Sequence, residues 1–235
     1  MDTDFIFLDS GIGGIPYLQY MQKIVPEKKC KYFADEKNFP YGTKTAEQIL
    51  EFSKKFVEQV LSLYKPKVIV LACNTMTVTV LEKMRELYPE VAFVGTVPAI
   101  KLAAKSSKSK KIGLLATEMT VKHDYIKKLV QDYASDCEVV YRADTKLVDF
   151  VEKNVQCDFR NGELLSVKWK VSEQEKIEAI TDVIDFFKKN NVDTIILGCT
   201  HFVHLVDEFE KVAGDKIQIV DSRDGVAKQA LRLSK

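Results

Sequence analysis

The sequence predicts an α/β protein with mostly parallel sheets. Short apolar, β-branched segments alternate along the chain with segments of helical periodicity, which is typical of strands joined by crossover helices. The run Val68–Leu71 is continuously apolar, as expected for a strand covered on both faces of a parallel sheet. In chain order, the strand candidates are Phe5–Leu8, Cys30–Ala34, Val68–Ala72, Val91–Val94, Ile112–Leu115, Cys137–Tyr141, Thr194–Leu197 and Ile217–Val220.

Two of the helical segments also carry a start signal. Thr45 with Gln48, and Ser172 with Glu175, have the spacing of a capping box, in which two side chains satisfy backbone N–H groups of the first turn. Apolar residues follow each box at helical spacing: Ile49, Phe52, Phe56, Val60 and Tyr64 after the first, and Ile177, Ile180, Ile184 and Phe187 after the second.

Composition excludes several classes of partner. Among 235 residues, 35 Lys and Arg balance 34 Asp and Glu for a net charge of +1, so there is no basic excess to bind nucleic acid. No stretch approaches the roughly 20 apolar residues that span a bilayer, and the N-terminus does not resemble a signal peptide. The five cysteines form no zinc-binding pattern, and their odd number indicates a reducing compartment. We therefore expect a cytoplasmic protein without a metal site.

An internal similarity divides the chain into two halves. Residues 66–75 resemble residues 191–200, because in both an apolar strand leads into a small residue, a cysteine and a polar residue. The carboxyl ends of strands in open α/β sheets face the ligand crevice. Two such halves facing each other would place Cys73 and Cys199 across one cleft.

These two cysteines differ in context from the other three. Each lies at a strand-to-helix junction, where the amides of the first helical turn favour an anion such as a thiolate. The spacing alone leaves catalysis and packing open for both. Cys30, Cys137 and Cys157 are interpreted as packing residues.

Further polar groups follow predicted strands. Asp9-Ser10-Gly11 follows the first strand, Pro40-Tyr41-Gly42-Thr43 follows the second, and His201 lies two residues beyond Cys199. A glycine-rich turn, a Pro/Gly turn and a helix-capping histidine are the alternative interpretations of each segment taken alone. Their common placement after strands favours a binding site.

Together these segments resemble the signature blocks of the glutamate racemases, in the cofactor-independent aspartate/glutamate racemase superfamily. The resemblance implies two pseudo-symmetric flavodoxin-like domains with the active site in the cleft between them. Residues 1–95 with 206–235 would form the first domain and residues 96–205 the second. The segments that carry the resemblance are Asp9–Gly11, Pro40–Thr43, Ala72–Thr75 and Gly198–His201, with weaker echoes at Val97–Lys101, Ala116–Val121, Leu147–Glu152 and Val220–Ser222.

The resemblance also assigns roles to residues. Cys73 and Cys199 would exchange the α-proton on opposite faces of glutamate, Asp9 would assist Cys73, and His201 with Glu152 would assist Cys199. No cofactor and no metal are implied, and a homodimer is possible. The substrate's ammonium and carboxylate groups would be held by Asp9, Ser10, Tyr41, Gly42, Asn74, Thr75, Thr117, Thr120, Thr200 and His201.

Two thiols suit this reaction. Racemisation removes a proton from one face of a carbon and returns one to the other, which a single monoprotic base does not readily do. A thiol with an unperturbed pKa of about 8.5 carries only a few per cent thiolate at pH 7, so one cysteine needs activation while its partner stays protonated. The resemblance thus implies an isomerase that supplies D-glutamate for peptidoglycan, cell wall biogenesis and cell shape.

Several residues depart from the family pattern. Met119 stands where glycine is frequent, Asp144 where cysteine is frequent, and Val203-His204 where Pro-Leu is usual. The segment after His201 is also short. These departures leave the substrate preference and the packing between domains open, so an aspartate or other amino-acid racemase of the same superfamily is an alternative. A non-catalytic, two-lobed amino-acid-binding protein is an alternative of another class.

Overall fold

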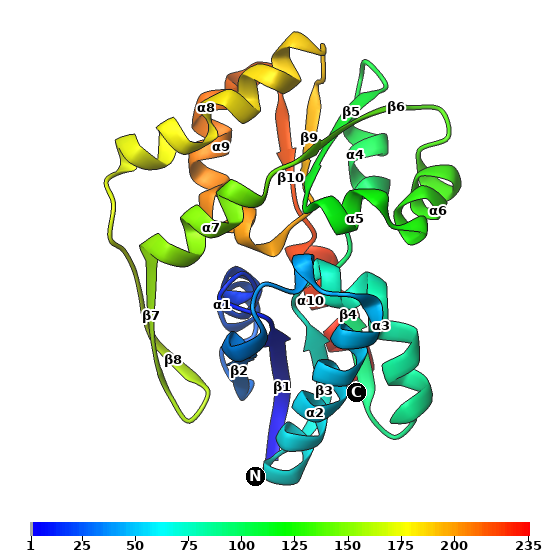
Figure 1. Ribbon diagram of the computed structural model, residues 1–235, viewed down its shortest axis with the longest axis vertical. Helices are drawn as coiled ribbons and strands as arrows, with labels where there is room; N and C mark the ends of the chain where they lie inside the picture. The colour runs from blue at the N-terminus through cyan, green and yellow to red at the C-terminus, as the bar shows by residue number, and fades with distance from the viewer. Residues whose placement is uncertain (1) are drawn as a thin grey trace. The chain divides into compact units, whose positions relative to one another are not determined.

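Two four-stranded parallel sheets organise the chain, which the computed structural model describes over residues 2–235 (Figure 1). Each sheet forms the centre of one compact unit. The first unit comprises the chain up to Val97, Cys157–Lys168 and Arg223–Lys235, and the second comprises Pro98–Gln156 and Trp169–Ser222. The chain therefore passes between the units several times.

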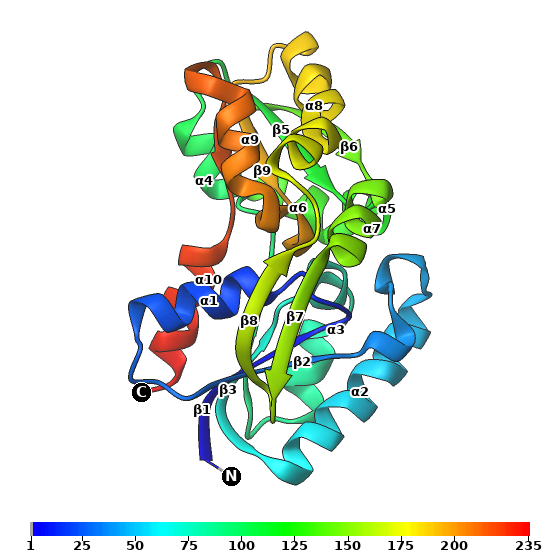
Figure 2. The ribbon, with the colours of Figure 1, turned by 90° about the vertical axis from the view of Figure 1, so that its left-hand side faces the viewer.

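The first sheet has the strand order β2-β1-β3-β4. Leu8 in β1 pairs with Phe33 in β2 and with Leu71 in β3, so the three strands end at the same edge. Helix α1 packs with α10, and α2 packs with α3. Figure 2 shows the strands between these two helix pairs. The elements of this unit are β1 (Asp2–Asp9), α1 (Ile15–Ile24), β2 (Cys30–Ala34), the 3₁₀ turns η1 (Glu36–Asn38) and η2 (Tyr41–Thr43), α2 (Ala46–Leu63), β3 (Lys65–Leu71), α3 (Asn74–Leu87), β4 (Ala92–Gly95) and α10 (Arg223–Leu233).

The second sheet has the order β10-β9-β5-β6. Its core includes Phe187, Phe202 and Phe209, which are fully buried. Helix α8 packs with α9, and α4 packs with α6. The elements are α4 (Ile100–Ser106), β5 (Lys111–Ala116), α5 (Glu118–Lys122), α6 (Asp124–Tyr133), β6 (Glu138–Ala143), α7 (Thr145–Asn154), α8 (Glu173–Lys189), β9 (Thr194–Leu197), η3 (Thr200–Leu205), α9 (Val206–Ala213), η4 (Gly214–Lys216) and β10 (Gln218–Val220).

The two sheets have the same topology. Numbered along the chain within its own unit, each sheet has the order 2-1-3-4, the order of the flavodoxin-like arrangement. All of the sequence-derived strand candidates are strands to within a few residues, and both capping boxes are present. The predicted α/β class and its internal pseudo-symmetry are therefore confirmed.

The division of the chain differs from the expected one by two residues at the first boundary, which lies after Val97 instead of residue 95, and in two longer segments. Residues 206–222 fall in the second unit, because β10 pairs with β9 in its sheet. Residues 157–168 fall in the first unit. They belong to a hairpin, β7 (Val155–Arg160) and β8 (Glu163–Trp169), which was not among the expected strands.

The hairpin turn is Asn161-Gly162, and both residues have positive φ, 49° and 77°. Two-residue hairpin loops require this conformation at both central positions, and Asn-Gly is the sequence that adopts it most readily. The Asn-Gly dipeptide is therefore the feature of the sequence from which the hairpin could have been predicted. No helix within residues 2–235 is long and apolar enough to cross a membrane.

Candidate active site

The first group of candidate residues lies where β1 and β3 end. Asp9 is the last residue of β1, and Cys73 precedes α3 as its N-terminal cap. These strands are neighbours, and the backbone N–H of Ala72 donates to the carbonyl of Leu8 at 2.7 Å. Both side chains are buried, with Asp9 at 0% and Cys73 at 8% exposure.

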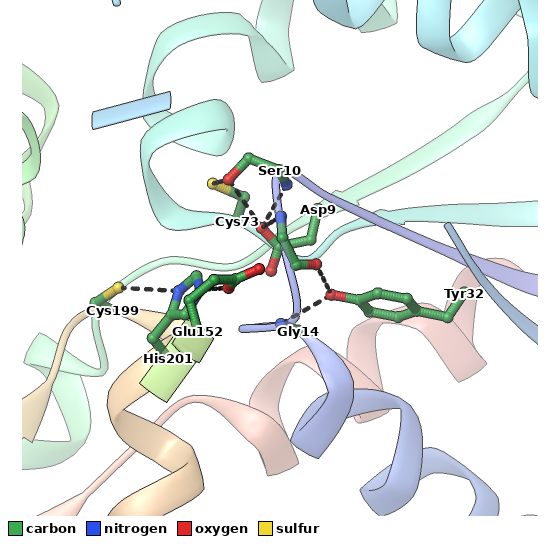
Figure 3. Close-up of polar contacts among 9 residues, drawn as sticks. Asp9, Ser10, Gly14, Tyr32, Cys73, Glu152, Cys199 and His201 are labelled. Carbon is green, nitrogen blue, oxygen red and sulfur yellow. Dashed lines mark hydrogen bonds and ion pairs between the residues drawn. The ribbon is translucent and has the colours of Figure 1, made fainter. Parts of the chain in front are cut away.

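Ser10 connects the carboxylate of Asp9 to the sulfur of Cys73. The Asp9 Oδ1 atom accepts hydrogen bonds from the backbone N–H of Ser10 at 2.6 Å and from its hydroxyl at 3.3 Å. The same hydroxyl oxygen lies 3.8 Å from Cys73 Sγ (Figure 3). A polar path therefore runs from the carboxylate through the hydroxyl to the thiol.

Asn74 begins helix α3 directly after Cys73. Its side chain is 97% buried, and neither its Nδ2 nor its Oδ1 atom has a hydrogen-bond partner among the described residues. A buried amide without partners costs free energy, roughly 1–3 kcal/mol, unless a ligand satisfies it. Asn74 is therefore suited to bind a polar group of a substrate, and Thr75 is buried beside it.

Tyr41 and Gly42 lie in η2, which contacts α3. The Tyr41 hydroxyl donates to Asp35 Oδ2 at 2.7 Å, and Asn38 Nδ2 donates to the same carboxylate. Burial of Tyr41 raises the pKa of its phenol strongly, and the hydrogen bond to Asp35 adds to this shift. Tyr41 is therefore a neutral hydrogen-bonding group and not a base at physiological pH.

The second group lies at the end of β9 and combines a thiol, an imidazole and a carboxylate. Cys199 is the N-terminal cap of η3, and its sulfur lies 3.8 Å from His201 Nδ1. The other ring nitrogen of His201, Nε2, lies 2.7 Å from Glu152 Oε2 (Figure 3). Cys199 and His201 are buried, whereas the Glu152 side chain is 21% exposed.

Glu152 is positioned by helix α7, which packs against η3. Asp144 caps this helix, because its carboxylate accepts a hydrogen bond from the backbone N–H of Leu147 at 2.9 Å. The residue that departs from the family pattern at position 144 therefore caps the helix that carries Glu152. Val203 is buried in η3, and the His204 ring contacts Trp169 edge-on.

Two of the three predicted threonines of the second unit lie together, and the third follows Cys199. Thr117 caps α5, and its hydroxyl oxygen lies 2.9 Å from that of the buried Thr120. Both follow β5, which pairs with β9 on one side and with β6 on the other. Thr200, adjacent to Cys199, is also buried.

The structure thus brings the predicted residues together in two groups, one in each unit. Asp9, Ser10 and Cys73 are linked in the first unit, and Cys199, His201 and Glu152 in the second. Sequence reasoning assigned no role to Asp35, which binds Tyr41, although its position after the second strand was a signal. Within residues 2–235, no three His, Cys, Asp or Glu side chains are grouped so that they could hold a metal ion.

Known proteins share this architecture. Residues 17–230 match the family described as Asp/Glu/Hydantoin racemase. A glutamate racemase of Treponema pallidum is 37% identical over 97% of this chain and 80% of its own length, and one of Bartonella henselae is 34% identical over the same shares. The crystal structure of Escherichia coli glutamate racemase with L-glutamate and the activator UDP-MurNAc-Ala superposes with a TM-score of 0.83, at 27% identity, over 99% of this chain and 82% of that one. With this match along nearly its whole length, the chain belongs to the Asp/Glu/hydantoin racemase family and is an amino-acid racemase, an isomerase.

Proposed function

We propose that the chain interconverts L- and D-glutamate by transferring the α-proton between Cys73 and Cys199. The observation that supports this most strongly is the equivalence of the two cysteines. Each is buried and follows the third strand of its own 2-1-3-4 sheet, and each has its own polar partners. Such a pair suits a reaction in which both faces of one carbon are addressed.

In one direction, the thiolate of Cys73 takes the α-proton and becomes a thiol, while the thiol of Cys199 gives a proton to the opposite face and becomes a thiolate. The reverse reaction exchanges these roles. The proton count balances, and no oxidant or reductant is consumed. Asp9, with Ser10, assists proton removal from Cys73.

On the other side, His201 and Glu152 assist Cys199. A carboxylate accepts hydrogen bonds, so the His201 Nε2–H donates to Glu152 in the neutral ring. The Nδ1 atom is then the acceptor that faces the sulfur of Cys199. The imidazole can therefore take the thiol proton and return it, as general acid–base catalysis requires.

The substrate's ammonium and carboxylate groups are bound by Asn74, Thr75, Tyr41, Gly42, Thr200, Thr117 and Thr120, with Asp9, Ser10 and His201 contributing. The assignment of Asn74 is supported by its buried amide, which has no hydrogen-bond partner among residues 2–235. The choice of glutamate as substrate is supported by the names of the relatives, which are glutamate racemases. The protein would act in the cytoplasm, and its product, D-glutamate, would serve peptidoglycan synthesis, cell wall biogenesis and cell shape. We also propose a homodimer, which light scattering would detect.

Deuterium wash-in tests the reaction and its substrate. The purified protein in D₂O is given L-glutamate, and the α-deuterium content and circular dichroism are followed. We expect deuterium at Cα and decay of the optical signal to zero, since the enantiomers have equal free energies. L-aspartate is the control, and exchange of aspartate in preference to glutamate would assign the chain to the other substrate. No exchange with either amino acid would reject the proposal.

A further inference from the structure

We propose that Tyr32 is a positioning residue for the Cys73 half of the site, and that the β7–β8 hairpin holds Tyr32 in place. This inference rests on the proposed function. It concerns a residue of strand β2 that lies outside the catalytic and substrate-binding groups named above. Tyr32 is 2% exposed, and its hydroxyl points to the loop that follows β1 (Figure 3).

The Tyr32 hydroxyl closes this loop by two hydrogen bonds. It donates to the carbonyl oxygen of Gly11 at 2.7 Å and accepts from the backbone N–H of Gly14 at 3.2 Å. The loop between these glycines follows directly on Asp9 and Ser10, and the Ser10 hydroxyl contacts both the Asp9 carboxylate and the Cys73 sulfur. The hydroxyl therefore fixes the segment that presents the carboxylate to the thiol.

Gly14 shows how little room this loop has. A Cβ atom at this position would lie 2.5 Å from the Cβ atom of Ala72 and 3.1 Å from Asp9 Oδ2. Ala72 immediately precedes Cys73. Gly14 is thus packed between the residue before the catalytic thiol and the carboxylate that assists it, and a displacement of Gly14 alters this spacing.

The hairpin contacts Tyr32 from the other side. The ring of Phe159 in β7 stacks on the Tyr32 ring, with 5.6 Å between centroids and 13° between planes. The backbone N–H of Tyr32 donates to the carbonyl oxygen of Gly162 at 2.8 Å. Lys31, the preceding residue, donates through Nζ to the carbonyl oxygen of Asn161 at 2.7 Å and pairs with Glu163.

These contacts separate two functions of one side chain. The ring and backbone of Tyr32 hold β2 to the hairpin, whereas the hydroxyl holds the loop next to Asp9. A substitution can remove the second contact and keep the first. Tyr32→Phe does this, because phenylalanine retains the stack with Phe159 but has no hydroxyl.

The test is a double-mutant cycle on glutamate racemisation. We expect Tyr32→Phe to lower kcat about tenfold, the size of effect that loss of two hydrogen bonds produces, with a smaller change in KM. In an Asp9→Asn background, the same substitution should lower kcat by less than about twofold, because Tyr32 acts through Asp9. The inference would be overturned if Tyr32→Phe lowered kcat by the same factor in the wild-type and Asp9→Asn backgrounds, or if Tyr32→Phe left kcat unchanged.

Tyr20→Phe is the matched control. This substitution also removes a hydroxyl hydrogen bond, because the Tyr20 hydroxyl donates to Asp224 at 3.1 Å. That bond is exposed and lies outside the site. The kcat of Tyr20→Phe should equal that of the wild type. Wild-type exchange of glutamate is measured first, so failure of the proposed function is seen as an inactive wild type and is distinct from failure of the inference.

The hairpin provides a second measurement that does not depend on the folding of Tyr32→Phe. Phe159→Leu removes the stacked ring and should lower kcat about threefold, a fraction of an aromatic pair's usual contribution. Phe159→Tyr keeps the ring and should restore wild-type turnover. Leu165→Ala, at a 58% exposed position on β8, should have no effect. Equal turnover of Phe159→Leu and Phe159→Tyr would show that the hairpin does not act on the site.

Discussion

The two cysteine sites occupy equivalent places in their sheets but have different chemical partners. Cys73 follows β3 and is linked through the hydroxyl of Ser10 to the carboxylate of Asp9. Cys199 follows β9 and is linked through the ring of His201 to the carboxylate of Glu152. Each thiol is thus separated from a carboxylate by one intervening group, a hydroxyl in one unit and an imidazole in the other.

The helical segments behind the cysteines also differ. Cys73 caps α3, an α-helix of 14 residues, whereas Cys199 caps η3, a 3₁₀ segment of six residues. Segment η3 continues directly into α9, so each cysteine precedes a helical stretch, but the first turn after Cys73 is α-helical and the first turn after Cys199 is 3₁₀. The comparison teaches that one topology, used twice, can place a buried thiol at the same point of two sheets and give it different polar partners.

The largest effect is expected when either cysteine of the pair is replaced. Cys73→Ser and Cys199→Ser should each lower racemisation about 10³-fold or more, because an alcohol is a far weaker acid than a thiol and general acid–base catalysis has this magnitude. Each variant should still exchange the α-proton of one enantiomer with D₂O, and the enantiomer should differ between the two. Exchange of the same enantiomer by both variants would contradict the assignment of one cysteine to each face.

A smaller effect is expected from the carboxylates. Asp9→Asn should lower kcat about 10²-fold, because Asp9 adjoins the buried hydroxyl that contacts Cys73. Glu152→Gln should lower it about tenfold, because the amide can still hydrogen-bond His201 and the side chain is partly exposed. Steady-state assays with both enantiomers measure the two values. The opposite ranking would show that the Cys199 side depends more strongly on its carboxylate.

The smallest effect concerns the stability contributed by Asp193, which directly precedes β9 at the end of the strand opposite Cys199. The Asp193 carboxylate accepts hydrogen bonds from the Ser107 hydroxyl and from the backbone N–H of Ser109, each at 2.6 Å. Burial by itself raises its pKa, but these hydrogen bonds outweigh burial and lower it from 3.8 to about 2. Its contribution to stability is therefore present above about pH 4 and is lost as the pH falls towards 2.

We expect Asp193→Asn to lower the free energy of unfolding at pH 7 by about 2 kcal/mol. Urea unfolding from pH 7 down to pH 2 should show the difference from the wild type shrinking. Asp4 in β1 of the first unit is the comparison, since burial also opposes the lowering of its pKa, which results from Lys29 N–H and the Lys67 ammonium. Asp4→Asn should have the smaller effect, and a pH-independent loss in Asp193→Asn would contradict the linkage.

Much of this arrangement could be predicted from the sequence. Continuous apolar runs located the strands of both sheets, and the repeat around Cys73 and Cys199 located the two strand ends. The contacts of Asp9 with Ser10 were accessible because these residues adjoin the end of β1. Local patterns of this kind persist in the fold because burial of a parallel strand and capping of a helix depend on neighbouring residues.

Long-range contacts were harder to predict from the sequence. The hairpin was missed although Asn161-Gly162 signalled it, because its strands lack a continuous apolar run and are partly exposed. The role of Tyr32 depends on a hydroxyl reaching a loop about 20 residues earlier and on a ring more than 100 residues later, which no local pattern encodes. The assignment of residues 206–222 to the second unit likewise depends on the pairing of β10 with β9.

Helix α10 has a consequence for the order in which the chain folds during synthesis. It packs against α1 and against β4, so the final segment of the chain completes the helical layer beside the first unit's sheet. The second unit contains no residue beyond Ser222. A nascent chain on the ribosome therefore has every residue of the second unit before the first unit receives its last helix. The unit that begins translation first thus receives helix α10 only after all residues of the second unit have been made, which differs from a chain whose domains follow one another in sequence.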